Sequence, residues 1–212
     1  MGIVYPQAQL SPAKIEIVRE WLSRRSWFDL DPETVVTRRR FGYRFDDPAG
    51  AVGVESVLVE TGDAVFQVPM TYRSAALPGA EDHFLATMEH SALGTRWIHF
   101  GLGDPVAVRA FVTAIVEGGS SVDVEFERDG ETTTLAMLVG ARGTGSGTAP
   151  ADLRIESVEA EGPVASVVTA SGTLSMPIRI DTAAAGDGAA LLGAWDDATD
   201  VPLASWEPVE SA

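Results

Sequence analysis

The chain has 212 residues, enough for one domain with a smaller subdomain and a sizeable hydrophobic core. Its 31 acidic residues outnumber 15 basic ones and give a net charge of −16. This balance argues against nucleic acid or an anionic membrane as the main partner, because phosphate binding needs clustered Lys and Arg. The chain contains no Cys, which excludes disulfides, thiolate catalysis and thiolate metal sites.

The first ten residues lack the basic segment and the apolar run of a signal peptide. No stretch approaches the ~18 consecutive apolar residues that a membrane-spanning helix needs. We therefore expect a cytoplasmic protein without a membrane partner. Composition alone does not indicate an activity.

Capping residues mark two helices. Ser11 and Pro12 predict the start of a helix over residues 11–25, in which apolar side chains recur at helical spacing. Asp104 is the predicted N-cap of a second helix over residues 104–117. Pro occupies the first position after this cap, and two Gly follow the last residue of the helix.

Most of the remaining sequence is typical of antiparallel strands, separated by short segments rich in Gly, Pro and Asp. The pair Asp129-Gly130 predicts the turn of a hairpin. Strands are predicted at residues 35–45, 52–60, 64–72, 122–127, 132–139, 153–158, 164–169, 174–180, 191–195 and 202–206. The fold class that follows is α+β, with a curved, mainly antiparallel sheet packed by the two helices.

Residues 143–150, GTGSGTAP, have the composition of a flexible linker. Their Gly spacing resembles a phosphate loop, but no Lys-Ser/Thr pair follows and no strong helix opens after them. The predicted division is therefore a domain over residues 1–142, a linker over 143–151 and a smaller β-rich subdomain over 152–212.

All three His lie in one polar segment, close to several carboxylates. Imidazoles and carboxylates can hold a divalent metal, yet the spacing matches no HExxH or comparable motif. We favour the simpler interpretation that these groups make local hydrogen bonds, and we predict no metal and no cofactor. The segment is still the first place to look for a ligand or partner, and its candidate residues are Glu81, His83, Glu89, His90, Arg96, Trp97 and His99, beside Asp82.

The densest group of cations is residues 38–40, three consecutive Arg, with Arg24 and Arg25 upstream. Arg forks suit a carboxylate or phosphate ligand. On a strand, however, the middle Arg points away from the other two, so ion pairs with the chain's own acids are the favoured interpretation.

Neither nucleophilic catalysis nor ring stacking has a strong signal. No GxSxG motif is present, and Ser91 is only a sequence neighbour of His90. Trp21, Trp27 and Phe28 could stack on a sugar ring, but aromatic side chains at helix and strand positions usually belong to the core.

A family resemblance adds to these observations. Residues 21–28, WLSRRSWF, directly follow the predicted helix start and resemble the opening of actinobacterial maltokinases. Three further segments are similar to the N-terminal cap domain of those enzymes: residues 65–72, VFQVPMTY, residues 80–82, AED, and the helix start at 101–105, GLGDP. Residues 87–97, TMEHSALGTRW, resemble small free-standing proteins described as maltokinase cap-like. The resemblance covers about residues 10–120 and continues more faintly to residue 180.

The resemblance implies a cystatin-like cap fold, followed by a part similar to a kinase's intermediate subdomain. In such kinases a Ser-Val-Val strand precedes a strand whose Lys holds the ATP phosphates. Residues 166–168 are Ser-Val-Val, but the aligned position lies near Pro177, and the single Lys of the chain is Lys14. The helical lobe with the catalytic Asp and the metal-binding loops has no counterpart in these 212 residues.

Phosphoryl transfer needs cations around the phosphates and carboxylates that position magnesium. We therefore expect a non-catalytic accessory or regulatory protein. The resemblance implies a sugar kinase or related enzyme as its partner, in glycogen, trehalose or amino-sugar metabolism. The alternative, from another class, is a small-molecule (sugar) binder or unrecognised hydrolase that uses residues 81–99.

Overall fold

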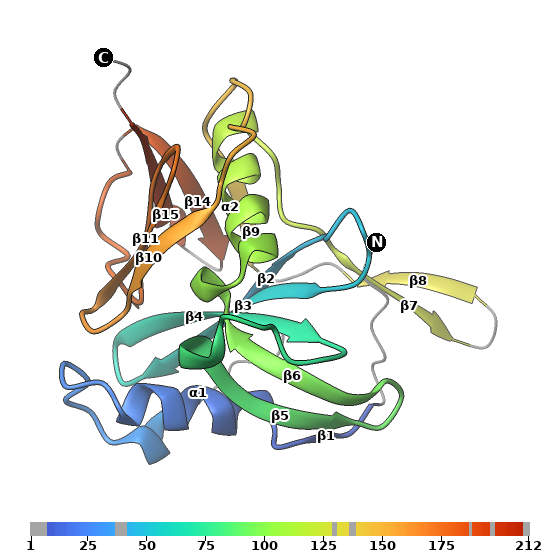
Figure 1. Cartoon of the computed structure of the whole chain (residues 1–212). Helices are drawn as coiled ribbons and strands as arrows, with labels where there is room; N and C mark the ends of the chain where they lie inside the picture. The colour runs from blue at the N-terminus through green and yellow to red at the C-terminus, as the bar shows by residue number, and fades with distance from the viewer. Residues whose placement is uncertain are drawn as a thin grey trace.

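The computed structural model describes residues 8–36, 42–128, 131–135, 139–186, 188–195 and 198–209 (Figure 1). Two antiparallel sheets and two α-helices make up most of these residues, as the predicted α+β class requires. Three 3₁₀ turns lie at Pro32–Thr34, Glu81–His83 and Gly101–Gly103. Neither helix among the described residues is long and apolar enough to cross a bilayer.

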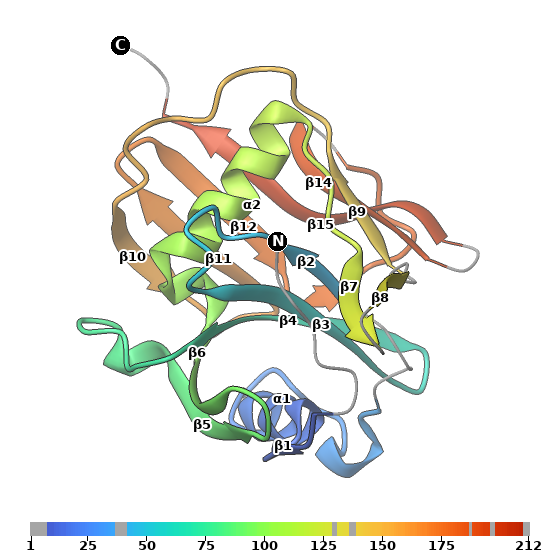
Figure 2. The ribbon, with the colours of Figure 1, turned by 90° about the vertical axis from the view of Figure 1, so that its right-hand side faces the viewer.

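The first sheet has seven strands in the order β1-β5-β6-β4-β3-β2, with β13 paired to β4 off this path. It curls around α1 as a half-barrel, with α1 below it in Figure 2. Strands β2, β3 and β4 are consecutive antiparallel strands with short connections, and they form a meander. The strand bounds are β1 Leu10–Ser11, β2 Gly42–Phe45, β3 Gly53–Thr61, β4 Ala64–Arg73, β5 Phe84–His90, β6 Gly94–Phe100 and β13 Arg179–Ile180.

Helix α1, Lys14–Ser23, begins later than the sequence predicts. Ser11 does not cap it, because the backbone of Ser11 pairs with Glu89 in the sheet. The N-cap is Ala13, whose N–H donates to the Glu16 carboxylate at 2.6 Å. Long-range strand pairing therefore replaces the local cap that the sequence favours.

Helix α2, Pro105–Glu117, has the predicted ends. The Asp104 carboxylate accepts the Val106 N–H at 2.9 Å, which satisfies one free donor of the first turn. Gly118 ends the helix in the left-handed region, with φ of 72°, where Gly avoids the strain that a Cβ brings.

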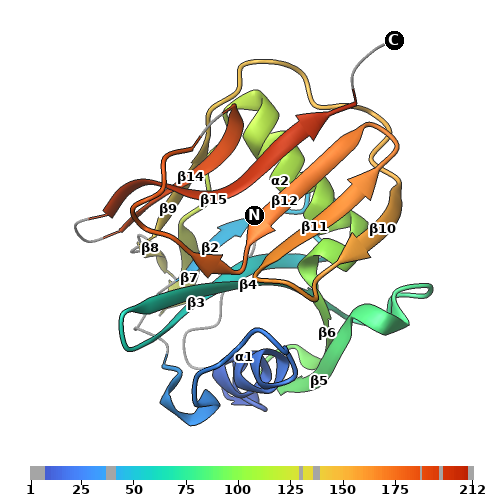
Figure 3. The same cartoon turned by 90° about the vertical axis from the view of Figure 1, so that its left-hand side faces the viewer.

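The second sheet has six strands in the order β10-β11-β12-β15-β14-β9, and α2 covers one of its faces (Figures 2 and 3). Its bounds are β9 Gly140–Gly143, β10 Ile155–Glu159, β11 Val164–Thr169, β12 Gly172–Pro177, β14 Ala189–Trp195 and β15 Ala198–Pro208. A separate hairpin joins β7, Val124–Arg128, to β8, Glu131–Leu135. The predicted turn residues Asp129 and Gly130 lie outside the described residues, as do the three Arg at 38–40.

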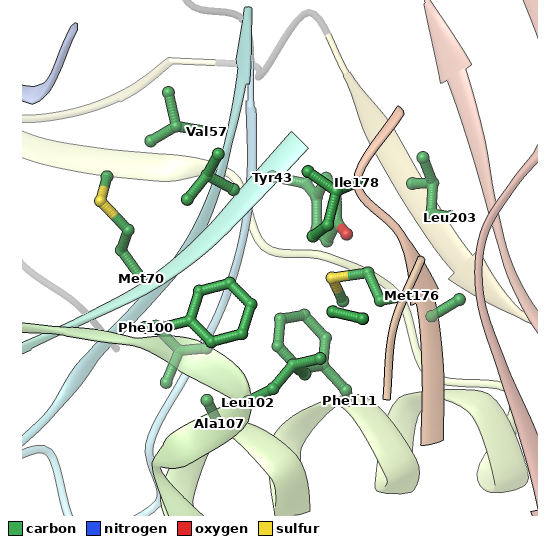
Figure 4. Close-up of a cluster of buried hydrophobic side chains, with 14 of the residues drawn as sticks. Tyr43, Val57, Met70, Phe100, Leu102, Ala107, Phe111, Met176, Ile178 and Leu203 are labelled. Carbon is green, nitrogen blue, oxygen red and sulfur yellow. The ribbon is translucent and has the colours of Figure 1, made fainter. Parts of the chain in front are cut away.

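One hydrophobic core joins the two sheets and both helices. Figure 4 shows side chains from the first sheet, such as Tyr43 and Phe100, meeting Phe111 of α2 and Met176 and Leu203 of the second sheet. Trp21, predicted to be core, is 5% exposed and stacks on Phe100 with ring centroids 5.1 Å apart.

The first half of the predicted linker is packed on the end of α2. The Gly145 N–H donates to the Ile115 carbonyl and the Gly147 N–H to the Val116 carbonyl, each at 2.9 Å. A Cβ on Gly143 would lie 1.7 Å from the Ala114 carbonyl oxygen, so the two backbones are in close contact. The division at 1–142, 143–151 and 152–212 remains a prediction. Movement of residues 143–147 as a linker would require these contacts with α2 to break.

Candidate functional site

A cavity of about 460 Å³ lies between the start of α1 and the curled first sheet. Charged and aromatic side chains from six elements share its wall with apolar ones such as Leu10 and Met88. The polar side chains on which its chemistry depends are Lys14, Arg44, Glu55, Tyr72, His90 and Arg96.

Strand register and α1 place an ion cluster at the centre of this wall. In the β2–β3 pair, Arg44 lies directly opposite Glu55, so the two side chains share a face of the sheet. Lys14, the first residue of α1, donates a hydrogen bond from Nζ to Glu55 Oε2 at 2.5 Å. The Lys14 ammonium also lies 5.2 Å from the centroid of the Tyr72 ring, a cation–π distance.

Glu55 is a charged group inside the protein, only 8% exposed. Burial by itself raises the pKa of Glu55, but the charges of Lys14 and Arg44 and the Lys14 hydrogen bond together hold that pKa below its usual value. Burial and the nearby Glu55 carboxylate raise the pKa of Tyr72 well above 10.0. At neutral pH the cluster therefore contains an ionised Glu55 and a neutral phenol.

The β5–β6 turn supplies the opposite part of the wall. His90 Nδ1 accepts the N–H groups of Ala92 and Leu93, each at 3.2 Å, so the ring proton of neutral His90 sits on Nε2. Partial burial, and then the charge of Arg96, lower the pKa of His90. Arg96 itself donates from Nη2 to the Leu93 carbonyl at 2.7 Å.

A second polar cluster holds the other end of the His-containing segment in place. Arg73 forms two hydrogen bonds to the Asp104 carboxylate, at 2.6 and 2.7 Å. Burial opposes ionisation of Asp104, but the hydrogen bonds from Arg73 and other donors keep its pKa below the usual value. His99, 1% exposed, accepts the Leu77 N–H at 3.4 Å, and burial lowers its pKa. The His83 ring lies against Gly103, where a Cβ would come within 2.3 Å of it.

The remaining predicted residues lie apart from the cavity. The Glu81 carboxylate accepts the Gly79 N–H at 3.0 Å on the surface. Glu89 accepts the Thr95 hydroxyl at 2.7 Å, and Trp97 is half-buried on β6. The structure therefore does not bring the seven candidates together: His90 and Arg96 line the cavity, and the other five do not. Within the described ranges no three His or carboxylate side chains converge as metal ligands.

Comparison with known families covers the part of the chain that builds most of this wall. Residues 21–104 match the maltokinase N-terminal cap domain. Over these residues the chain is similar to that cap domain. The matched cap runs from Trp21 in α1 to Asp104, the N-cap of α2, and includes strands β2 to β6. No curated protein and no solved structure matches the chain significantly.

Sequence reasoning missed four polar residues of the cavity wall. Glu55 carries the clearest signal, since it interrupts the apolar run of β3 at a buried position. Lys14 stands out only because it is the single Lys. Arg44 and Tyr72 carry no local signal, because their place depends on pairing between strands.

Proposed function

We propose that this protein is a non-catalytic accessory or regulatory cap, which acts beside a sugar kinase. The match of residues 21–104 to the maltokinase cap supports this role, because the cap is by name a domain of a kinase. The link to glycogen, trehalose or amino-sugar metabolism rests on the same resemblance. We also propose that the half-barrel around α1 is a cystatin-like cap and that the second sheet corresponds to a kinase's intermediate subdomain.

The positions of two residues support a non-catalytic role. The single Lys, Lys14, is bound to Glu55 and lies in the first helix. Pro177, near the position where the resembling kinases carry their phosphate-binding Lys, ends β12, and its carbonyl accepts a hydrogen bond from Gln67. A Pro there has no cation to offer a phosphate.

Two measurements test this proposal. The chain alone is incubated with ATP and maltose or glucosamine, and we expect no phosphorylated sugar. The chain is then added to a sugar kinase encoded near it, with an unrelated acidic protein as control, and we expect a complex on gel filtration and a changed kcat or KM. Phosphorylation by the chain alone would contradict the non-catalytic role, and neither complex nor kinetic change would contradict the accessory role.

Small-molecule binding is the second candidate function, and the cavity is the observation that favours it. Its volume of about 460 Å³ lies in the range of small-molecule sites. Of the seven candidate residues that the sequence indicates in segment 81–99, only His90 and Arg96 line it, so the binding site we propose differs from the one the sequence indicates.

A further inference from the structure

Hydrogen-bond acceptors in the cavity wall are already used within the protein. The Asp47 carboxylate accepts the N–H groups of Ala49, Ala51 and Val52, each at 3.0 Å. Glu55 is bound to Lys14, and Asp46 has an interaction partner of its own. A ligand that enters the cavity therefore meets few carboxylate oxygens in need of a donor.

The cationic donors are less completely used. Arg44 makes no side-chain hydrogen bond within the part of the chain that the structure describes, although its charge acts on Glu55. Arg96 uses Nη2 for the Leu93 carbonyl, and a guanidinium has five N–H donors. The three cations of the wall are balanced by its three carboxylates, but the N–H donors of Arg44 and Arg96 are not all used.

The buried hydroxyl of Tyr72 lies in the same wall and is also engaged within the protein. It forms a side-chain hydrogen bond with the Glu55 carboxylate. Glu55 therefore has two donors, Lys14 and Tyr72, and offers little to a ligand.

We propose that this cavity binds a small organic oxyanion, a carboxylate or a phosphate ester, through Arg44 and Arg96. Guanidinium forks match both oxyanions, and charge-assisted hydrogen bonds of this kind are the strong ones. The body of the ligand lies against the apolar side chains of Leu10, Met88 and Leu93, which share the wall. The proposal deepens the second candidate function and does not depend on a kinase partner.

Isothermal titration calorimetry at constant ionic strength tests this site with inorganic phosphate, glycerol 3-phosphate, succinate and uncharged glycerol. We expect saturable binding of at least one organic anion and none of glycerol. The contrast between glycerol 3-phosphate and succinate shows whether phosphate esters or carboxylates are preferred. Arg96→Gln should weaken the binding about tenfold or more, since it removes a charged donor.

The matched control is Arg142→Gln, because Arg142 is exposed, pairs with Asp200 and does not line the cavity. Arg44→Gln is a second test of the site. If loss of the charge beside Glu55 unfolds the protein, the result with Arg96→Gln decides. An NMR titration of His90 provides an independent readout, because a bound anion near Arg96 should raise the pKa of His90.

No saturable binding of any organic anion, or equal weakening by Arg142→Gln and Arg96→Gln, would overturn the proposed site. Binding of glycerol as tight as that of glycerol 3-phosphate would also overturn it. None of these outcomes changes the complex or the kinetics measured with a sugar kinase, so the two proposals fail separately.

Discussion

Gln67 on β4 is a buried polar link between the two sheets, and its replacement by Leu is a sharp test of the fold. Its Oε1 accepts the Tyr43 hydroxyl at 2.7 Å. Its Nε2 donates to the carbonyls of Pro177 and Leu203, each at 2.7 Å. The side chain is fully buried, so water cannot replace these partners.

Gln67→Leu keeps a side chain of similar size and removes these three hydrogen bonds, together with a longer one at 3.4 Å from the Ser56 hydroxyl to Gln67 Oε1. Each buried group left unpaired costs about 1–3 kcal/mol, so three groups predict a loss of about 3 kcal/mol or more in the free energy of unfolding. Urea unfolding followed by Trp fluorescence measures the change. Gln9→Leu is the matched control, because the Gln9 side chain is exposed and should change stability by less than about 0.5 kcal/mol.

A Gln67→Leu protein with stability equal to that of Gln9→Leu would refute the bridging role. The urea unfolding curve of the unsubstituted protein tests whether the two sheets unfold together. Because one core joins both sheets, we expect a single cooperative transition. Two separate transitions would instead support a domain that unfolds independently on each side of residues 143–151.

Three further changes test other parts of the protein. Trp21→Ala should cost about 3–5 kcal/mol in urea unfolding, because it leaves a cavity in the core, and a stable folded variant would contradict the core role. Gly143→Ala should lower the free energy of unfolding by about 1–3 kcal/mol or more, because the new Cβ would meet the backbone of α2. Gly140→Ala on the same strand is the control, since a Cβ there has open space, and equal losses in the two variants would contradict the close packing of Gly143. Burial is the main cause that lowers the pKa of His99 in the folded protein, so the free energy of unfolding should fall as the pH drops below the ordinary pKa of 6.5. His99→Gln should flatten this part of the stability–pH curve, and an unchanged slope would contradict the role of His99.

Local signals predict the elements whose ends are fixed by near neighbours. Asp104 and Gly118 define both ends of α2 through contacts within one turn, and the sequence places both correctly. The predicted N-cap of α1 is wrong by two residues, because Ser11 pairs with a strand almost eighty residues away. No cap rule contains that information, since it belongs to the tertiary fold.

The candidate segment divides between two faces of the sheet, because a strand points successive side chains to opposite faces. In the β5–β6 pair, Met88 lies opposite Arg96, and His90 shares their face toward the cavity. Glu89 and Trp97 occupy alternate positions and therefore lie on the other face. The period-two alternation along a strand is enough to separate the candidate residues into two faces from the sequence. Which of the two faces lines a cavity depends on the curl of the sheet, which the sequence does not show.

The cavity also depends on residues outside the matched cap. Lys14 and Leu10 precede the match, which begins at Trp21, while Arg44 and Arg96 lie within it. Lys14 donates a hydrogen bond to Glu55 and, together with the charge of Arg44, holds it ionised. A cap without an equivalent of Lys14 would leave Arg44 as the main partner of Glu55, and Arg44 would then have fewer donors for an anion. The proposed oxyanion site is therefore a property of this chain's first helix together with its cap, and the family match alone does not imply it.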